Sequence, residues 1–272
     1  MKFTFLGTAS CEGIPALFCN CPRCAAARVL GGKNIRTRTQ ALIDDDILID
    51  LPPDTLYHFQ TQGIEGHKIK HLLMTHSHSD HLFPKEIHNR GPKRCSDMEA
   101  DVLHVWCTKG TFDAFSAIGV REDYVQLHLV RPFEPFVLGK YRVTPLPATH
   151  NDEGEPVIYL IEGEKTLLYA LDSGYFSSEV FDYLAAQKVH LDFTVFDCSL
   201  VERDWPHILA HMGVHRIRRT VQQLRELGVA TDGTTHSISH FSHNGQALHD
   251  DIEALVKDDG YLVPYDGLKI DL

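Results

Sequence analysis

The segment Thr75-His76-Ser77-His78-Ser79-Asp80-His81 limits the fold of this chain more than any other, because it places four metal-binding side chains within six residues. It directly follows a short apolar run that is typical of a buried strand. Side chains two apart in an extended segment face the same way, so His76 and His78 can bind one ion together. Asp80 and His81 follow where the chain must turn, and from there they can reach a second ion. A solvated polar loop is the alternative, but it gives no reason for this residue choice.

Three further ligand candidates, His150, Asp172 and His240, each stand just past an apolar run. Strand ends are where α/β proteins build their sites, although one isolated polar residue there is more often an ordinary surface group. The total of 18 histidines is also more than chance would place on the surface. Imidazoles and carboxylates suit Zn²⁺, Mn²⁺ or Fe²⁺ alike, so the ligand types do not choose the metal.

Apolar runs predict strands early in the chain and an alternation of strands and helices later. The predicted strands are residues 2–6, 40–44, 47–50, 71–74, 102–107, 125–130, 141–146, 157–162, 166–171 and 193–196. The predicted helices are residues 53–62, 111–117, 177–186, 214–227 and 244–256. The acidic triplet Asp44-Asp45-Asp46 is typical of a hairpin turn. No repeat or linker divides the chain, so we expect one domain over residues 1–272, an α/β fold with two sheets between helices.

Composition limits the partners and the cellular compartment that we expect for the chain. The net charge is −11 and the sequence pI about 5.9, which argues against a nucleic-acid partner and leaves a small phosphorylated substrate open. No apolar run approaches the roughly 20 residues that cross a bilayer. The amino-terminal segment lacks a signal-peptide cleavage pattern, so we expect a cytoplasmic protein with no membrane partner. A homodimer is left open.

The cysteines form a second candidate metal site. Of seven cysteines, Cys19, Cys21 and Cys24 crowd into six residues. In a cytosolic protein such a cluster favours a metal site over disulfides, and a tetrahedral Zn²⁺ needs a fourth ligand. His243, three residues after His240, is the candidate for it. Three merely buried cysteines are the alternative.

The histidine segment resembles the HxHxDH signature of the metallo-β-lactamase superfamily, and the other candidates follow in the order of that superfamily's ligands. The resemblance implies an αββα sandwich with two mixed sheets. It also implies two metal ions, one held by His76, His78 and His150, the other by Asp80, His81 and His240, with Asp172 bridging them. Such a pair, roughly 3.5–4 Å apart, can hold a bridging hydroxide and neutralise charge on a phosphoryl group. Asp50 either orients a ligand histidine or is an ordinary strand-end residue.

The segment Gly7-Thr8-Ala9-Ser10-Cys11-Glu12-Gly13-Ile14-Pro15 resembles the first loop of the phosphodiesterase branch, which includes tRNase Z and PhnP; Ala9 stands where a glycine is common. The cysteine cluster with His243 is similar to the structural zinc site of PhnP-type enzymes. These resemblances imply hydrolysis of a small cyclic phosphodiester such as 5-phosphoribosyl 1,2-cyclic phosphate.

The resemblance implies that Asp80 and His211 act in catalysis, His211 as the acid that protonates the leaving oxygen. His207 and His215 are rival candidates, and His211 as a plain helix residue is the alternative. Leu200 and Val201 depart from the His-Pro that the family often carries here.

Other interpretations remain at this stage. Arg36 and Arg38 bind a second phosphate or belong to a solvated basic loop. A tRNase Z-like ribonuclease would usually carry a long tRNA-clamping insertion, which the chain lacks. A metal-binding sensor without activity would not need seven ligands. β-Lactam or thioester hydrolysis fits the fold but not the first loop.

Overall fold

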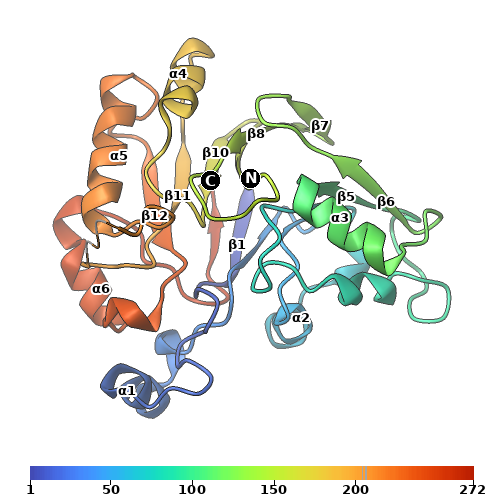
Figure 1. The fold of residues 1–272 in the computed structure, drawn as a ribbon, viewed down its shortest axis with the longest axis horizontal. Helices are drawn as coiled ribbons and strands as arrows, with labels where there is room; N and C mark the ends of the chain where they lie inside the picture. The colour runs from blue at the N-terminus through green and yellow to red at the C-terminus, as the bar shows by residue number, and fades with distance from the viewer. Residues whose placement is uncertain (204, 206) are drawn as a thin grey trace.

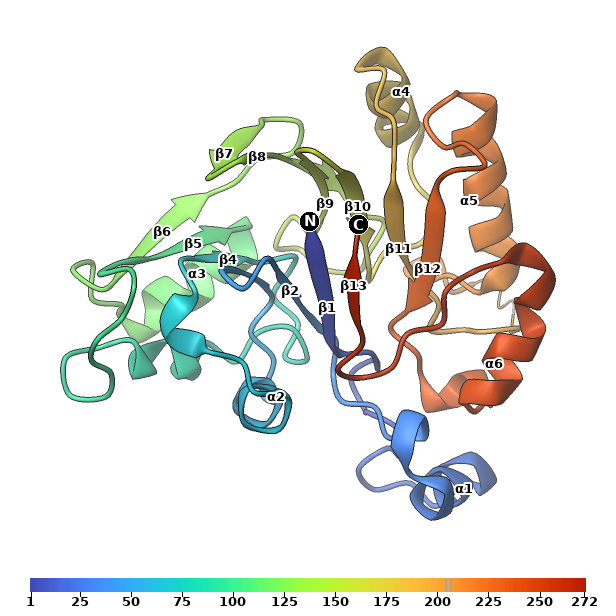
Figure 2. The same ribbon diagram turned by 180° about the vertical axis from the view of Figure 1, so that it is seen from behind.

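A computed structural model, which describes residues 1–203, 205 and 207–272, shows two sheets packed face to face with helices on both outer faces (Figure 1). The first sheet has the strand order β13-β1-β2-β3-β4-β5-β6. Its strands are β1 (Lys2–Gly7), β2 (Gln40–Ile43), β3 (Ile47–Ile49), β4 (His71–Leu73), β5 (Leu103–Cys107), β6 (Val125–Leu129) and β13 (Lys269–Asp271). The chain ends lie side by side because β1 pairs with β13, with Lys2 opposite Asp271 (Figure 2).

The second sheet has the order β12-β11-β10-β9-β8-β7. Its strands are β7 (Phe136–Leu138), β8 (Tyr141–Pro147), β9 (Val157–Glu162), β10 (Thr166–Ala170), β11 (Phe193–Asp197) and β12 (Thr235–Ser239). Strands β3 to β6 pair in parallel in one sheet, and β10 to β12 in the other. Parallel strands end at the same edge of a sheet, so each sheet offers a row of carboxyl ends on which a site can form.

Three apolar layers hold the sandwich together. Between the sheets, the aromatic side chains of Phe3, Phe5, Tyr169 and Phe193 are buried in one cluster. Helices α2 (Thr55–Gln62) and α3 (Lys109–Ile118) cover the outer face of the first sheet (Figure 1). Helices α4 (Ser178–Ala186), α5 (Val214–Glu226) and α6 (His249–Leu255) cover the outer face of the second. The αββα sandwich expected from the sequence is therefore confirmed.

Helix α1 (Pro22–Leu30) projects from the sandwich (Figures 1 and 2) and was not predicted. It begins at Pro22 and is capped by the preceding Cys21, whose sulfur accepts a hydrogen bond from the backbone N–H of Cys24. The predicted helix at 244–256 was too long. A 3-10 turn spans His243–Gly245, and Gln246 adopts a left-handed conformation with φ of 59° that interrupts the helix before α6.

Candidate metal centre

The first ligand group consists of His76, His78 and His150, whose candidate ligand atoms all lie within 4.8 Å of one another. His76 and His78 stand on the extended segment that leaves β4, and His150 follows β8. The Nδ1 atom of His78 and the Nε2 atom of His150 are 3.0 Å apart. Residues from both sheets therefore converge on one point.

The second ligand group consists of Asp80, His81, Asp172 and His240, and all four side chains are buried. Asp172 stands two residues past the end of β10 and His240 directly follows β12, and both have a positive φ, 47° and 63°. That conformation is uncommon outside glycine, so tertiary contacts must hold both residues in place.

Asp172 touches both groups. Its Oδ2 atom lies 2.6 Å from Nε2 of His81 and 3.5 Å from Nε2 of His76. Its Oδ1 atom lies 3.2 Å from Nε2 of His240 and 3.9 Å from Nε2 of His150. Burial alone would raise the pKa of Asp172, but His240 and His81 hold that pKa well below its usual value. A buried carboxylate between two imidazole groups has the position that a bridging ligand requires.

The donor set fits divalent ions, because several buried polar atoms face one another without hydrogen bonding. Three buried atoms among the described residues have no hydrogen-bond partner: Nε2 of His76, Nε2 of His81 and Oδ1 of Asp172. The close approaches of the Asp172 oxygens to the histidine rings do not meet the geometry of a hydrogen bond. Buried polar atoms without partners are costly, so a group of them implies a missing partner. Imidazole nitrogens and carboxylate oxygens are ligands that Zn²⁺ and Mn²⁺ accept.

Hydroxyl groups fix the tautomers of two ligand histidines. The Oγ1 of Thr39 donates to the backbone oxygen of Ala9 at 2.9 Å, so it accepts from Nδ1 of His240, which is also 2.9 Å away. In the same way Thr75 donates to Asp50 and accepts from Nδ1 of His76 at 3.0 Å. Each ring is left with the lone pair of Nε2 in the site, as a metal ligand needs.

Asp50 and two backbone carbonyls hold the remaining histidines. Oδ2 of the buried Asp50 accepts from Nδ1 of His81 at 2.7 Å, so Asp50 orients the ring of this candidate ligand. Nε2 of His78 is 3.1 Å from the carbonyl of Asn151, and Nδ1 of His150 is 3.4 Å from that of Ala210. The nitrogen opposite each contact is the one that faces the site.

His211 lies beside this centre, between β11 and α5. Its Nδ1 is 3.0 Å from Oδ2 of Asp197 and 3.2 Å from Oδ1 of Asp172. Burial of the ring opposes protonation, but the Asp197 carboxylate outweighs it and raises the pKa of His211 to about 9. His207 and His215 are exposed, so of the three acid candidates His211 is the one at the metal centre. Its position also groups it with Asp172, Asp197 and His240 as a set that could hold an ion.

The cysteine cluster meets the predicted histidine. Cys19, Cys21, Cys24 and His243 bring their candidate ligand atoms within 4.8 Å of one another. Nδ1 of His243 is 3.6 Å from the sulfur of Cys24 and 3.9 Å from that of Cys21. The backbone N–H of Cys24 and the ring of His243 lower the pKa of Cys21 to about 6, which favours the thiolate that binds zinc.

Glu12, which the sequence did not single out, connects the cysteine cluster to the first loop. It accepts hydrogen bonds from the hydroxyls of Ser242 and Ser10, and its Oε1 lies 3.8 Å from Nε2 of His243. A carboxylate behind a ligand histidine is a common outer partner in metal sites. The role of Glu12 depends on its contact with His243, which is far away in the sequence. No local sequence pattern could therefore have predicted it.

Arg36 corrects the sequence interpretation, because it neither lies in a solvated loop nor faces the metal centre. It is 3% exposed, donates to Thr8 and to the carbonyl of Pro264 at 2.7 Å each, and lies 2.8 Å from Nδ1 of His249. Arg38 is partly exposed and pairs with Asp54 at 3.2 Å. Arg36 therefore holds the first loop against the carboxyl-terminal segment.

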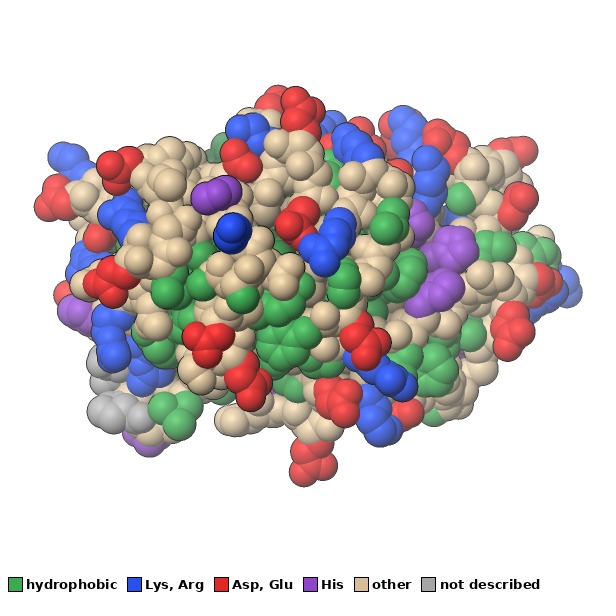
Figure 3. Space-filling model, turned by 90° about the horizontal axis from the view of Figure 1, so that it is seen from above, with side chains coloured by type: hydrophobic (Ala, Val, Ile, Leu, Met, Phe, Trp, Pro, Cys, Tyr) green, Lys and Arg blue, Asp and Glu red, His purple; other side chains and the backbone are tan. Residues whose placement is uncertain are grey.

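A second group of histidines lies away from the metal centre. Figure 3 shows histidine side chains gathered on the side of the molecule where β5 and β6 lie. His104 stacks against His71 with ring centroids 5.7 Å apart, and its Nδ1 is 3.0 Å from Nε2 of His128. Trp106 covers His128 at 4.5 Å. These ring contacts pack His104 and His128 against their neighbours on β4 and β5.

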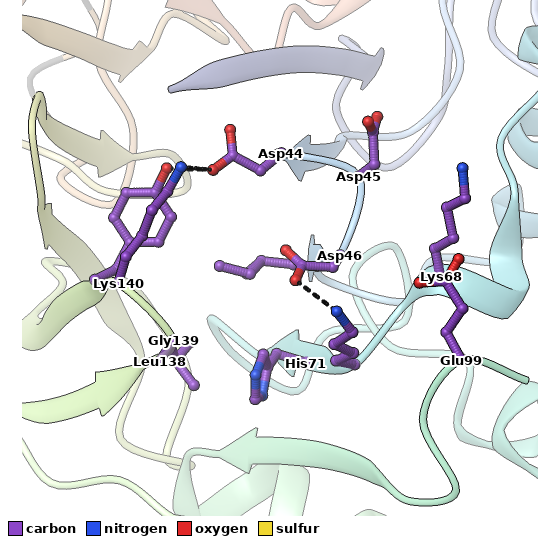
Figure 4. A pocket seen from close by; sticks show the side chains of 12 residues that line it. Asp44, Asp45, Asp46, Lys68, His71, Glu99, Leu138, Gly139 and Lys140 are labelled. Carbon is purple, nitrogen blue, oxygen red and sulfur yellow. Dashed lines mark hydrogen bonds and ion pairs between the residues drawn. The ribbon is translucent and has the colours of Figure 1, made fainter.

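A pocket of about 470 Å³ opens at the edge of the sandwich where the hairpin Asp44–Asp46 lies (Figure 4). Its charges are largely paired. Lys140 lies 2.8 Å from Asp44, and Lys70 lies 3.5 Å from Asp46. Strand β3 starts at this pocket and ends beside Asp50, which contacts His81. The length of the strand therefore separates the pocket from the metal centre. In the part of the chain that the structure describes, no helix is long and apolar enough to span a membrane.

The comparisons with known proteins agree on the fold. The family model described as "Beta-lactamase superfamily domain" matches residues 46–237. Among solved structures, a diphosphatase from the PhnP family is 21% identical, with a TM-score of 0.76 over 100% of this chain and 97% of the other. Zinc-bound PqqB from Methylobacterium extorquens is 20% identical, with a TM-score of 0.75 over 100% of both chains. The short form of human tRNase Z is 13% identical, with a TM-score of 0.67 over 100% of this chain and 99% of the other. No curated protein matches the chain in sequence.

Proposed function

The chain belongs to the beta-lactamase superfamily, and from this premise we propose that it is a metal-dependent hydrolase of a small phosphodiester. The expected substrate is a cyclic ribose phosphate such as 5-phosphoribosyl 1,2-cyclic phosphate. One observation carries the proposal: Asp172 lies between the two ligand groups, and His211 lies 3.2 Å from the same carboxylate. Two sets of candidate metal ligands beside an imidazole that could donate a proton are the parts that phosphodiester cleavage requires.

The ligand atoms divide into two sets. His76, His78 and His150 would hold one ion, Asp80, His81 and His240 the other, and Asp172 would touch both. When bound, two such ions supply an activated water and neutralise the charge that develops on a phosphoryl group. Neither Zn²⁺ nor Mn²⁺ is favoured by these ligands over the other.

His211 supplies the proton that leaves with the departing oxygen. Its raised pKa keeps the ring protonated at neutral pH, and Asp197 fixes the orientation of the ring through Nδ1. Nε2 is then the atom that can donate to a substrate. When a cyclic diester opens, a sugar oxygen leaves the phosphorus. Without a proton it would leave as a strongly basic alkoxide, so it needs the proton of a general acid.

The cysteine cluster would hold a structural zinc. Cys24 lies in the projecting helix α1, Cys19 and Cys21 stand just before it, and His243 follows His240 by three residues. A tetrahedral ion there ties α1 to the segment that carries a catalytic ligand.

The charge of the chain favours a small substrate over a polynucleotide. The net charge of −11 disfavours an extended nucleic-acid surface. The names of two structural neighbours, a diphosphatase and a tRNase Z, both point to phosphate chemistry, but on substrates of very different size. A diphosphate ester is therefore the nearest second substrate class, and precursor tRNA the more distant one.

The test is a substrate panel on metal-replete protein: bis-p-nitrophenyl phosphate, cyclic ribose and nucleoside phosphates, diphosphate esters and precursor tRNA. We expect chelator-sensitive turnover of the cyclic phosphates, and none with the variant Asp172→Ala. Turnover of precursor tRNA alone would replace the proposal by a nuclease. The absence of metal-dependent turnover on every substrate would remove it.

A further inference from the structure

Arg216, in the first turn of α5, contacts the backbone of the His211 segment, which we define as residues 207–211. One terminal nitrogen of its guanidinium donates to the carbonyl of His211 at 2.9 Å and also to the carbonyl of Ile208. The other terminal nitrogen lies 3.2 Å from the carbonyl of Trp205. Because a guanidinium is planar and rigid, one side chain fixes these three carbonyls relative to one another.

The position of Arg216 in the helix is unfavourable for a cation. The amino end of a helix carries a partial positive charge, which favours acidic residues in the first turn. The first turn of α5 contains no acidic residue. The carbonyl oxygens around the guanidinium offset this cost, so the contact with the His211 segment accounts for an arginine at this position.

The His211 segment lies directly on the turn that follows Asp172. A Cβ atom added to Gly174 would lie 1.7 Å from the carbonyl oxygen of Leu209, so only glycine allows this approach. The carbonyl of the next residue, Ala210, lies 3.4 Å from Nδ1 of His150. The segment therefore contacts two of the turns that carry candidate metal ligands, and the place of its backbone sets the place of the His211 ring.

We propose that Arg216 positions His211 for proton transfer by holding its segment on Gly174. This inference rests on the proposed function, since it concerns the proton donor of that reaction. Asp197 orients the ring through Nδ1 at 3.0 Å, whereas Arg216 fixes the backbone from which the ring extends. Arg216 is a positioning residue, because it acts on the reaction through His211.

The test is the variant Arg216→Met in the full, metal-loaded chain, assayed on a cyclic ribose phosphate and on bis-p-nitrophenyl phosphate. A displaced proton donor slows the substrate whose leaving oxygen needs a proton. We expect kcat for the cyclic phosphate to fall by about tenfold to a hundredfold, with KM and the bis-p-nitrophenyl phosphate rate within about twofold of the unaltered chain. Arg216→Lys, which keeps a donor, should lose less. Arg225→Met is the matched control at the other end of α5, where Arg225 lies 3.9 Å from Asp232, and it should change neither rate.

Two further variants separate positioning from a general loss of structure. The double variant with His211→Ala and Arg216→Met should be no slower than His211→Ala alone, because Arg216 acts through His211. Gly174→Ala displaces the same segment without altering Arg216, so it should show the same loss on the cyclic phosphate alone. It also keeps the inference testable if Arg216→Met fails to fold.

Hydrogen exchange of the substrate-free, metal-loaded chain distinguishes this inference from the proposed function. Mass spectrometry should show faster backbone exchange in the His211 segment of Arg216→Met, with β9 and β10 still protected and metal affinity, measured against a chelator, unchanged. If the unaltered chain hydrolysed no phosphodiester, the proposed function would fail, and exchange would still decide whether Arg216 holds the segment. The inference is overturned by unchanged exchange in the segment, by an equal loss of rate on both substrates, or by an added loss in the double variant.

Discussion

Asp197 holds His211 by a contact of 3.0 Å between its Oδ2 atom and Nδ1 of the ring, and the carboxylate itself is fully buried. The same carboxylate accepts hydrogen bonds from the backbone of Ser199 and of Met212, so its position is fixed from both sides. The proposed proton donor is therefore both oriented and charged by one residue at the end of β11. This arrangement makes the pH dependence of the reaction a direct test of the assignment.

Asp197→Asn should move the alkaline limb of the pH–rate profile to lower pH. A general acid works while it is protonated, so activity falls as the pH rises through the pKa of His211, which is raised to about 9. Removing the negative charge lowers that pKa by about 1–3 units. The measurement is kcat/KM against pH, with Asp192→Asn, whose carboxylate pairs with Lys165 at the surface, as the control. An unmoved limb would separate Asp197 from the proton donor.

His211→Ala should affect substrates unequally. We expect a loss of about 10²–10⁴ in kcat for a sugar cyclic phosphate, because its leaving oxygen needs a proton. The loss should be far smaller for bis-p-nitrophenyl phosphate, because p-nitrophenolate leaves without one. His215→Ala, on the exposed face of α5, should change neither rate. An equal loss on both substrates would instead indicate that His211 binds substrate or metal.

Asp50→Ala should weaken metal binding by about tenfold to a hundredfold without removing a ligand. The carboxylate of Asp50 contacts Nδ1 of His81 and both polar groups of Thr75, which in turn holds His76. Competition with a chelator of known affinity measures the effect. Asp46→Ala, at the opposite end of β3, is the matched control, since Asp46 pairs with Lys70 near the surface. Equal metal affinity in both variants would assign Asp50 a purely structural part.

The sequence predicted residues whose signal is local and missed those defined by distant contacts. His76, His78, Asp80 and His81 lie in one short segment, and β10 and β12, both parallel to β11, bring Asp172 and His240 to the same edge. His150 instead follows β8, which is antiparallel to both of its neighbours. Glu12 gave no local signal, since its contacts with Ser242 and His243 cross more than 200 residues.

Arg36 was expected to be exposed or to bind phosphate, and it is buried because of contacts that are distant in the sequence. Its sequence surroundings are polar and basic, which is typical of an exposed loop, yet its partners Pro264 and His249 are 228 and 213 residues away. The helix predicted to start at residue 244 starts later, because a 3-10 turn ends at Gly245 and Gln246 adopts a left-handed conformation. Helix propensity alone does not predict this interruption. Helix α1 was missed because its start depends on a sulfur acceptor, Cys21, rather than a usual capping oxygen.

Arg36→Met should lower stability and leave substrate affinity unchanged. The buried guanidinium donates to Thr8 and to Pro264, and its loss leaves those acceptors unpaired. We expect a fall of about 2–4 kcal/mol in the free energy of unfolding, measured in denaturant. Arg38→Met, which removes a partly exposed ion pair, should cost less than about 1 kcal/mol. A raised KM at unchanged stability would return Arg36 to the role of a phosphate-binding residue.

Alkylation of the thiols should report the cysteine site directly. With zinc bound, Cys19, Cys21 and Cys24 are protected by coordination; after chelation we expect Cys21 to react first, because its pKa is lowered to about 6 and it is a thiolate at neutral pH. Cys107 should stay unreactive in both states, since burial raises its pKa to about 12. Mass spectrometry of the modified peptides reads the order, and Cys95, on the loop beside Arg90, serves as the internal control because its reactivity should not depend on the chelator. If Cys21 reacted equally fast before and after chelation, the cluster would hold no ion, and α1 would be attached to the His243 segment by packing alone.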